Sequence, residues 1–185
     1  MSCIDLLNGL DPTCEALTKV GGVNKRVWIG QKSALTSFTT NGTTFYVETF
    51  TFSVGNGFKK FIGKRDKHFG NVELVDGENV NTFNHIVNLV LYHLTPADKI
   101  AIEGLCNAED LFVLLENNAG QIEVFGIDLG LNATAGTGGT GTLLNDSTAF
   151  TVTLSGENLK MPRVFKNTGT STLADNITYL DGLVA

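Results

Sequence analysis

Residues 111–131, LFVLLENNAGQIEVFGIDLGL, restrict the possible folds of this chain more than any other stretch. Two apolar runs, Leu111–Leu115 and Gln121–Ile127, lie on either side of the polar turn Asn-Asn-Ala-Gly. Runs of this length around a glycine-containing turn are typical of a β-hairpin. The chain leaves the hairpin through Asp128-Leu129-Gly130-Leu131, and no catalytic group stands at the tip. The sequence therefore predicts a mainly β domain in which this hairpin has a structural use.

The segment Thr43–Val54 is expected to be a strand that follows a tight turn. The preceding Asn41-Gly42 pair is a strong signal for such a turn. Within the segment, the apolar residues change parity near Glu48-Thr49. Because side chains in a strand alternate with a period of two, this change predicts a bulge, a bend or a passage from one sheet to another.

Further strands are expected where short apolar or alternating runs are bounded by turn residues. They are expected over Val23–Ile29, Lys60–Ile62, Asn71–Val75, Val80–Tyr92 and Ala149–Leu154. The second half of Val80–Tyr92 is apolar at both parities, which predicts burial on both faces.

One helix is predicted, and its start is the clearest local signal in the chain. Thr95 is a good N-cap, Pro96 fits the first helical position, and Asp98 replaces the usual capping-box glutamate. A one-sided apolar stripe follows and ends near Cys106 or Asn107.

These elements predict one mainly β domain of the β-sandwich or partly closed barrel type, with one flanking helix at about residues 95–107. The length of 185 residues is typical of a single domain with a sizeable core. The domain is expected over residues 23–165, with a long projecting loop at 55–79. Residues 1–22 are expected to form an N-terminal arm, and residues 166–185 a C-terminal arm or edge strand.

Charge and cysteine content exclude several classes of protein. The net charge of −6 provides no overall attraction to nucleic acid phosphates. The chain contains three cysteines, Cys3, Cys14 and Cys106. An odd number at wide spacings fits neither a disulfide framework nor a zinc site, and free thiols favour folding in a reducing cytoplasm. The N-terminal residues lack a signal-peptide pattern, and no apolar run is long enough to span a membrane.

No catalytic or cofactor site is predicted, so we expect that the protein is not an enzyme and binds no metal or cofactor. His68, His85 and His93 are too widely spaced to share a metal on a regular strand. The GTGGTG stretch at 136–141 lacks the lysine and the following helix of a phosphate-binding loop, and is expected to be a flexible loop. Leu154-Ser155-Gly156 lacks the pattern of a nucleophile elbow.

The predicted loop at 55–79 contains a cluster of basic and aromatic residues. The cluster consists of Phe58, Lys59, Lys60, Phe61, Lys64, Arg65, Lys67 and Phe69. Such a segment can dock onto an acidic neighbour in an assembly, grip single-stranded nucleic acid, or form an ordinary solvated hairpin. The net negative charge of the chain favours the assembly interpretation.

The C-terminal half resembles the tail-tube family of bacteriophage virion proteins, in particular those from phages of Bacteroidetes hosts. The resemblance rests on the capped helix, on LFVLLENNAGQIEVFGIDLGLNATAGTGGTG and on NDSTAFTVTLSGENLKMPRVF. An early cysteine and the first strand GGVNKRVWI also fit the family pattern, so the similarity covers about residues 14–165.

The resemblance implies a structural role in the virion tail. Six copies would form a ring, and stacked rings would form a tube for genome delivery, held together by the loop at 55–79 and the terminal arms. The expected partners are other copies of the chain and other phage tail proteins, while viral DNA passes without specific binding and no membrane is bound. The protein would be made in the host cytoplasm. An acidic inner wall would repel DNA, and Glu48, Glu116, Glu123 and Asp128 are its candidate residues.

Two alternatives remain open from the sequence. One is another tail component on the same fold, such as a connector ring or terminator protein. The other is a ligand- or carbohydrate-binding β-sandwich module, which usually displays exposed Trp and Tyr for stacking. The single Trp and three Tyr of this chain make that module the weaker alternative.

Overall fold

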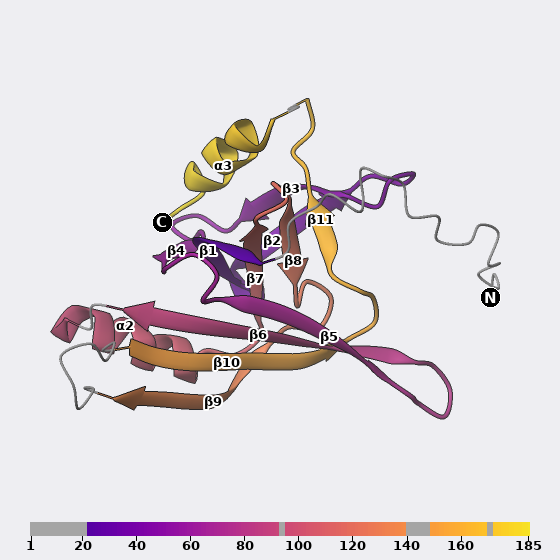
Figure 1. The fold of residues 1–185 in the computed structure, drawn as a ribbon. Coiled ribbons are helices and arrows are strands. Elements are labelled where there is room, and N and C mark those ends of the chain that lie inside the picture. The colour runs from indigo at the N-terminus through magenta and orange to yellow at the C-terminus, as the bar shows by residue number, and fades with distance from the viewer. Residues whose placement is uncertain (1–21, 93–94, 140–148, 170–171) are drawn as a thin grey trace.

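The chain folds as a β-sandwich of two sheets with two helices, as the computed structural model shows (Figure 1). The structure describes residues 22–92, 95–139, 149–169 and 172–185. The predicted mainly β, sandwich-like fold is confirmed, and the strands form no closed barrel. The predicted N-terminal arm lies almost entirely outside the described residues.

The larger sheet has seven strands and the smaller has four. In spatial order, the larger sheet contains β2 (Leu35–Thr40), β3 (Val47–Phe52), β11 (Arg163–Phe165), β8 (Ile122–Phe125), β7 (Leu111–Asn117), β1 (Val23–Gln31) and β4 (Lys59–Ile62). The smaller sheet contains β5 (Phe69–Val75), β6 (Thr82–Tyr92), β10 (Ala149–Asn158) and β9 (Asn132–Gly139). Neighbouring strands are antiparallel except β11 and β3, and a short 3-10 helix, η1 (Lys32–Ala34), joins β1 to β2.

The predicted hairpin at 111–131 is confirmed as β7 and β8, with Val113 opposite Phe125. Its first strand is apolar at consecutive positions because the seven-stranded sheet is covered on both faces. Leu111, Val113 and Leu115 belong to the core between the sheets, whereas Phe112 and Leu114 belong to a second core on the opposite face.

The change of parity near Glu48 is explained by a bulge. The pairing of β2 with β3 shifts register between Thr39 and Thr40, which lie beside the start of β3. The strand begins only at Val47, because the turn occupies the preceding residues and Phe45 has a φ of 58°. Both Val47 and Phe50 are buried although their parities differ, as a bulged strand allows.

Helix α2 (Pro96–Asn107) confirms the helix predicted from its cap. The Thr95 hydroxyl accepts a hydrogen bond from the backbone N–H of Asp98, and the Asp98 carboxylate accepts one from the backbone N–H of Thr95. Ile102 and Leu105 are buried in the core between the sheets. The helix therefore covers one end of the sandwich (Figure 1).

The C-terminal segment contains a second helix where an extended arm or edge strand was expected. Helix α3 (Leu173–Asp181) packs on the outer face of the seven-stranded sheet, and Leu180 is fully buried there. Its Tyr179 hydroxyl accepts a hydrogen bond from the N–H of Phe50 at 3.1 Å. The apolar residues Leu173, Ile177 and Leu180 recur at helical spacing, which is the signal that predicts this helix.

The glycine-rich stretch at 136–141 is not wholly a loop, because Gly136–Gly139 belong to β9. Gly136 and Gly138 allow the Phe150 ring of β10 to pack closely, since a Cβ built on Gly138 would lie 2.4 Å from that ring. The prediction for β6 also needs correction: its odd-numbered residues from His85 to Leu91 are buried, but the alternating residues are only half-buried.

Candidate interaction surfaces

The segment 55–79 is not a single projecting loop. Its first part forms β4 at the edge of the seven-stranded sheet, and its second part forms β5 at the edge of the four-stranded sheet (Figure 1). Residues 63–68 only connect these two edges. The element that projects from the sandwich is the hairpin of β5 and β6, whose tip lies at residues 76–81 (Figure 1).

The three phenylalanines of the basic cluster have different environments. Phe58 is fully buried, and its ring meets the Phe50 ring edge-on at a centroid distance of 5.2 Å. Phe61 is half-buried and packs against the core between the sheets. Only Phe69 is substantially exposed, at 49%. The structure therefore removes Phe58 from the set of residues that can contact another molecule.

The basic residues of the cluster are largely engaged within the chain. The Lys59 ammonium donates to the carbonyl of Ala185 at 2.9 Å, and the Lys60 ammonium forms a 2.7 Å ion pair with Asp181. The Arg65 guanidinium donates to the Asn118 side chain at 2.9 Å. These contacts fasten β4 and the following connection to the C-terminal residues and to the hairpin of β7 and β8.

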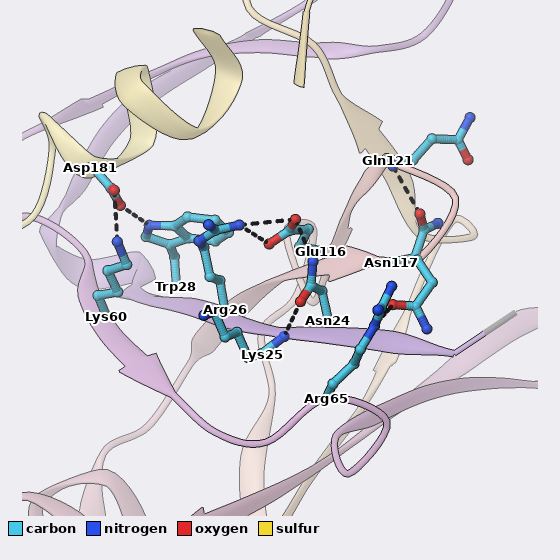
Figure 2. A network of polar contacts seen from close by, with 11 residues as sticks. Asn24, Lys25, Arg26, Trp28, Lys60, Arg65, Glu116, Asn117, Gln121 and Asp181 are labelled. Atoms are coloured by element: carbon cyan, nitrogen blue, oxygen red, sulfur yellow. Dashed lines mark hydrogen bonds and ion pairs between the residues drawn. The ribbon is translucent and has the colours of Figure 1, made fainter. Parts of the chain in front are cut away.

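Asp181 is the centre of a polar network at the end of α3 (Figure 2). Its carboxylate accepts hydrogen bonds from the Trp28 indole N–H at 2.9 Å and from Lys60. Partial burial opposes ionisation of the Asp181 carboxyl, but hydrogen bonds from Lys60 and Trp28 and the positive charges of Lys60 and Arg26 together lower its pKa. The network joins the C-terminal helix to β1 and β4.

Glu116 cannot contribute to an acidic wall that faces DNA. Its side chain is buried, and it forms a 2.8 Å ion pair with Arg26 (Figure 2). It also accepts a hydrogen bond from the Asn24 amide at 2.8 Å. The prediction for Glu116 is therefore wrong, because these two β1 side chains already pair with the carboxylate.

The other candidate acidic residues are half-buried and lie on different elements. Glu48, on β3, accepts a hydrogen bond from the Asn41 side chain at 3.1 Å. Glu123, on β8, accepts one from Asn117 at 3.0 Å and lines a cavity of about 380 Å³. Asp128 lies in the turn after β8, where its carbonyl accepts from Lys32. Whether these three carboxylates face a channel stays a prediction.

His85 is a structural residue that joins the two sheets. Its Nδ1 accepts a hydrogen bond from the N–H of Gly126, and its Nε2 lies 2.9 Å from the carbonyl oxygen of Lys160. The carbonyl can only accept, so Nε2 carries the proton and the ring is neutral. Burial lowers the pKa of His85, although the Lys160 carbonyl and the Asp128 charge act in the opposite direction.

His68 is buried and has one unsatisfied nitrogen. Its Nδ1 accepts a hydrogen bond from the N–H of Val90 at 3.1 Å, whereas its Nε2 has no hydrogen-bond partner in the structure. The ring lies against Gly63, where an added Cβ would be 2.0 Å from Nε2. Burial lowers the pKa of His68. His93 lies outside the described residues.

The part of the chain that the structure covers contains no candidate metal site. Among those residues, no group of three or more His, Cys, Asp or Glu side chains is arranged to hold a metal ion. In the same part of the chain, no helix is long and apolar enough to cross a membrane.

Sequence reasoning missed a groove of about 700 Å³ between α2 and β4. The apolar residues that line it include Ile29, Phe61, Leu91, Ile102, Leu105 and Val184. These residues come from four elements and the C-terminal end, so no local pattern predicts that they converge. The helix start at Thr95 is the one local signal related to the groove, because it predicts a helix that must pack on some part of the sheets.

Four strands form the outer edges of the two sheets: β2 and β4 in one, β5 and β9 in the other. Within the ranges that the structure describes, no further strand pairs with the outer side of any of them, and the two isolated bridges, Phe58 with Val184 and Leu111 with Leu131, lie directly before β4 and β9. Strand β9 is eight residues long and mostly exposed. Open edges of this kind readily pair with another strand.

Comparisons with family models, with curated proteins and with solved structures found no match to this chain.

Proposed function

We propose that this chain is a structural protein of a bacteriophage tail, and that copies of it assemble into stacked rings that form the tail tube. The observation that carries the proposal is the set of open strand edges on β2, β4, β5 and β9. The resemblance of the sequence to the tail-tube family supplies the identity of the assembly. The sandwich fold with a helix at one end is of the class that this resemblance implies.

Open edges favour a ring over a monomer on physical grounds. An exposed edge presents unpaired N–H and C=O groups, which a monomer must protect and which a neighbouring copy can pair. A head-to-tail contact between identical subunits forms a ring when its rotation closes. Both sheets have an outer strand on each side, so one copy can offer different edges to two neighbours.

The hairpin of β5 and β6 is the best candidate for contact between rings. It projects beyond the sandwich and carries the exposed apolar side chains of Leu74 and Val80, each 63% exposed (Figure 1). Apolar side chains at the end of a projecting element are costly in water and are typical of a contact surface. This hairpin replaces the basic cluster at 58–69 as the expected contact.

A ligand-binding module is less well supported. Such a module needs an aromatic platform on its surface, and the single tryptophan, Trp28, is fully buried. Its indole N–H is already paired with Asp181. We therefore retain the assembly function as the proposal.

Sedimentation velocity over a range of protein concentrations, combined with negative-stain electron microscopy, tests this function. We expect rings or tubes of uniform diameter. Leu74→Lys together with Val80→Lys should prevent stacking of the rings, whereas Val54→Lys should not, because Val54 lies in an exposed turn outside the hairpin. A monomer that persists at the highest concentrations would overturn the proposal.

A further inference from the structure

The Asn41-Gly42 pair lies in the turn over residues 41–46, which joins the edge strand β2 to β3. Asparagine followed by glycine is open to reaction within the chain, because glycine has no side chain to shield the peptide nitrogen between the two residues. Within the described residues this dipeptide occurs at Asn41-Gly42 and at Asn56-Gly57, whereas Asn8-Gly9 lies outside them. The two described pairs allow a comparison within one folded chain.

The reaction is an intramolecular substitution at the side-chain amide of asparagine. The backbone nitrogen of the glycine loses its proton to solvent and forms a bond to Cγ, the bond between Cγ and Nδ2 breaks, and Nδ2 takes up a proton and leaves as ammonia. Water then opens either carbonyl of the resulting succinimide and gives aspartate or isoaspartate. The rate depends on how close Cγ is held to the glycine nitrogen and on how well the negative charge that develops on Oδ1 is stabilised.

The side chain of Asn41 is folded over the peptide group that would attack it. Its Oδ1 accepts hydrogen bonds from the backbone N–H groups of Thr43 and Thr44, both at 3.0 Å. A side chain that reaches the N–H of the second following residue closes a ring around the peptide between them, so Cγ lies on the side of the Gly42 nitrogen. The same two donors surround the oxygen that becomes negative during the attack, as the donors of an oxyanion hole do.

Gly42 has the space to move toward this carbon. It is exposed, and a Cβ built on it would meet nothing within 4 Å. The ends of the turn are fixed, because the N–H of Asn41 donates to the carbonyl of Tyr46 and the N–H of Phe45 donates to the carbonyl of Asn41, each at 2.9 Å. The peptide between Asn41 and Gly42 can therefore rotate without a change in the strands on either side.

The Asn56-Gly57 pair has the opposite arrangement. The Asn56 Nδ2 donates to the Ser53 hydroxyl at 2.9 Å, which directs the side chain back along the chain and away from Gly57. A Cβ built on Gly57 would lie 2.2 Å from the carbonyl oxygen of Leu183, and the same carbonyl accepts the N–H of Phe58 at 2.9 Å. This packing opposes rotation of the peptide between Asn56 and Gly57.

We propose that Asn41 is a site of spontaneous modification, where the folded protein converts the side-chain amide to a carboxylate through a succinimide with Gly42, while Asn56 is protected. Solvent exposure alone predicts the other order, because Asn56 is exposed and Asn41 is half-buried. The inference does not depend on the proposed assembly function.

The modification would loosen β2. The Asn41 Nδ2 donates to Glu48 Oε1 at 3.1 Å. In the aspartate product an oxygen takes the place of Nδ2, so two carboxylates would share this site and repel each other. Isoaspartate would instead add a methylene group to the main chain between the two strands. Among the described residues β2 pairs in its sheet only with β3, so a change in this turn acts on its single ladder.

Incubation of the full chain in ¹⁸O-labelled water at mildly alkaline pH, in buffer and in urea, tests the site. Digestion at acidic pH and mass spectrometry then measure labelled aspartate and isoaspartate at each position. We expect Asn41 to convert at least about tenfold faster than Asn56 in the folded protein, and both to convert at similar rates in urea. Conversion of Asn56 as fast as that of Asn41 in the folded protein, or the same ratio of rates in buffer and in urea, would overturn the inference.

Gly42→Ala identifies the attacking atom. The added methyl group has free space in the fold, so the turn should form as before, but it shields the nitrogen that attacks Cγ. Conversion of Asn41 should slow at least about tenfold, with an unchanged circular dichroism spectrum. An unchanged rate would contradict attack by the nitrogen of residue 42.

Hydrogen exchange measures the consequence for β2. Asn41→Asp reproduces one product, and Asn56→Asp is the matched control. Exchange of the β2 amides should be at least about fivefold faster in Asn41→Asp and unchanged in the control. Addition of Glu48→Gln to Asn41→Asp should restore slow exchange, because the introduced amide can donate to the new carboxylate. Unchanged exchange in Asn41→Asp, or equal effects of the two aspartate variants, would overturn the loosening of β2.

Discussion

The Nδ1 atom of His85 accepts a hydrogen bond from the backbone N–H of Gly126 at 3.0 Å, and this bond joins β6 of one sheet to the chain that leaves β8 of the other. The bond requires a neutral ring, because a protonated imidazole has no acceptor. His68 makes the same kind of bond to Val90. The neutral His85 ring therefore links the two sheets, and the neutral His68 ring links the connection before β5 to β6 within the smaller sheet.

The stability of the protein should fall as pH decreases from 7.5 to 5.5. Burial lowers the pKa of both His68 and His85 in the folded state. At pH values between the lowered pKa of each histidine and its unfolded pKa of about 6.5, the unfolded chain therefore binds more protons than the folded chain. Stability from each histidine is thus complete above pH 6.5 and is lost as pH falls through the folded pKa. Each group contributes at most about 1.4 kcal/mol per pH unit.

Urea denaturation at the two pH values measures this effect. His85→Gln should be less stable at pH 7.5 and should lose less stability on acidification than the wild type does. An unchanged urea midpoint for the wild type between pH 7.5 and 5.5 would contradict the prediction.

Arg26→Met should destabilise the fold more than Glu116→Gln. The Glu116 side chain is 2% exposed and depends on Arg26, whereas the Arg26 side chain is 30% exposed and can turn to water. Removing the arginine leaves a buried charge unpaired and should cost about 3 kcal/mol. Glu116→Gln keeps a polar group of the same shape and should cost about 1 kcal/mol.

Thermal unfolding at neutral pH gives the order of these two variants. The double variant should be less destabilised than the sum of the single variants, since the pair interacts directly. A larger loss of stability for Glu116→Gln than for Arg26→Met would contradict the prediction that an unpaired Glu116 carboxylate is the costlier change.

Gly138→Ala should destabilise β9, and Gly139→Ala should not. A Cβ at Gly138 would lie 2.4 Å from the Phe150 ring, whereas a Cβ at Gly139 would meet nothing within 4 Å. Displacement of the ring should cost about 1–3 kcal/mol, and the neighbouring change should stay within about 0.5 kcal/mol of the wild type. Chemical denaturation of the two variants side by side provides the measurement, and equal losses would mean that Phe150 moves freely.

Local signals in the sequence predicted the elements whose structure depends on neighbours in the chain. The capping box at Thr95 and Asp98 and the hairpin at 111–131 belong to this class, whereas the tight turn expected at Asn41-Gly42 is a longer turn over residues 41–46. Each uses hydrogen bonds or turns between residues only a few positions apart, so propensity and spacing are sufficient.

Pairings between distant segments were not predictable in the same way. The basic, glycine-flanked segment at 58–69 has the composition of a surface loop, yet β4 pairs with β1, whose partner residues lie at least 30 positions earlier. The groove between α2 and β4 depends on this pairing and on the C-terminal residues. Helix α3 is a different case, because the helical spacing of Leu173, Ile177 and Leu180 is visible in the sequence but the apolar stripe is short.

Phe58→Ala and Phe69→Ala test whether the phenylalanines of the segment 58–69 differ in their contribution to stability, although the composition of the segment suggests a surface loop. Both residues stand beside lysines or histidine in the sequence, but Phe58 is fully buried and Phe69 is 49% exposed. The Phe58 ring lies 4.9 Å from Phe52 and 5.6 Å from Phe112, measured between centroids. Its removal leaves a cavity in the core under α3 and should cost about 3–5 kcal/mol, whereas Phe69→Ala should cost less than about 1 kcal/mol.

Urea denaturation of the two variants, with circular dichroism to verify the fold, distinguishes them. If Phe58→Ala proves too unstable to purify, Phe58→Leu keeps most of the volume and should still unfold at a lower urea concentration than Phe69→Leu. Equal midpoints for the two leucine variants would mean that Phe58 lies at the surface. In that case the segment would be the free loop that its composition suggests, and the groove beside β4 would lose one of its walls.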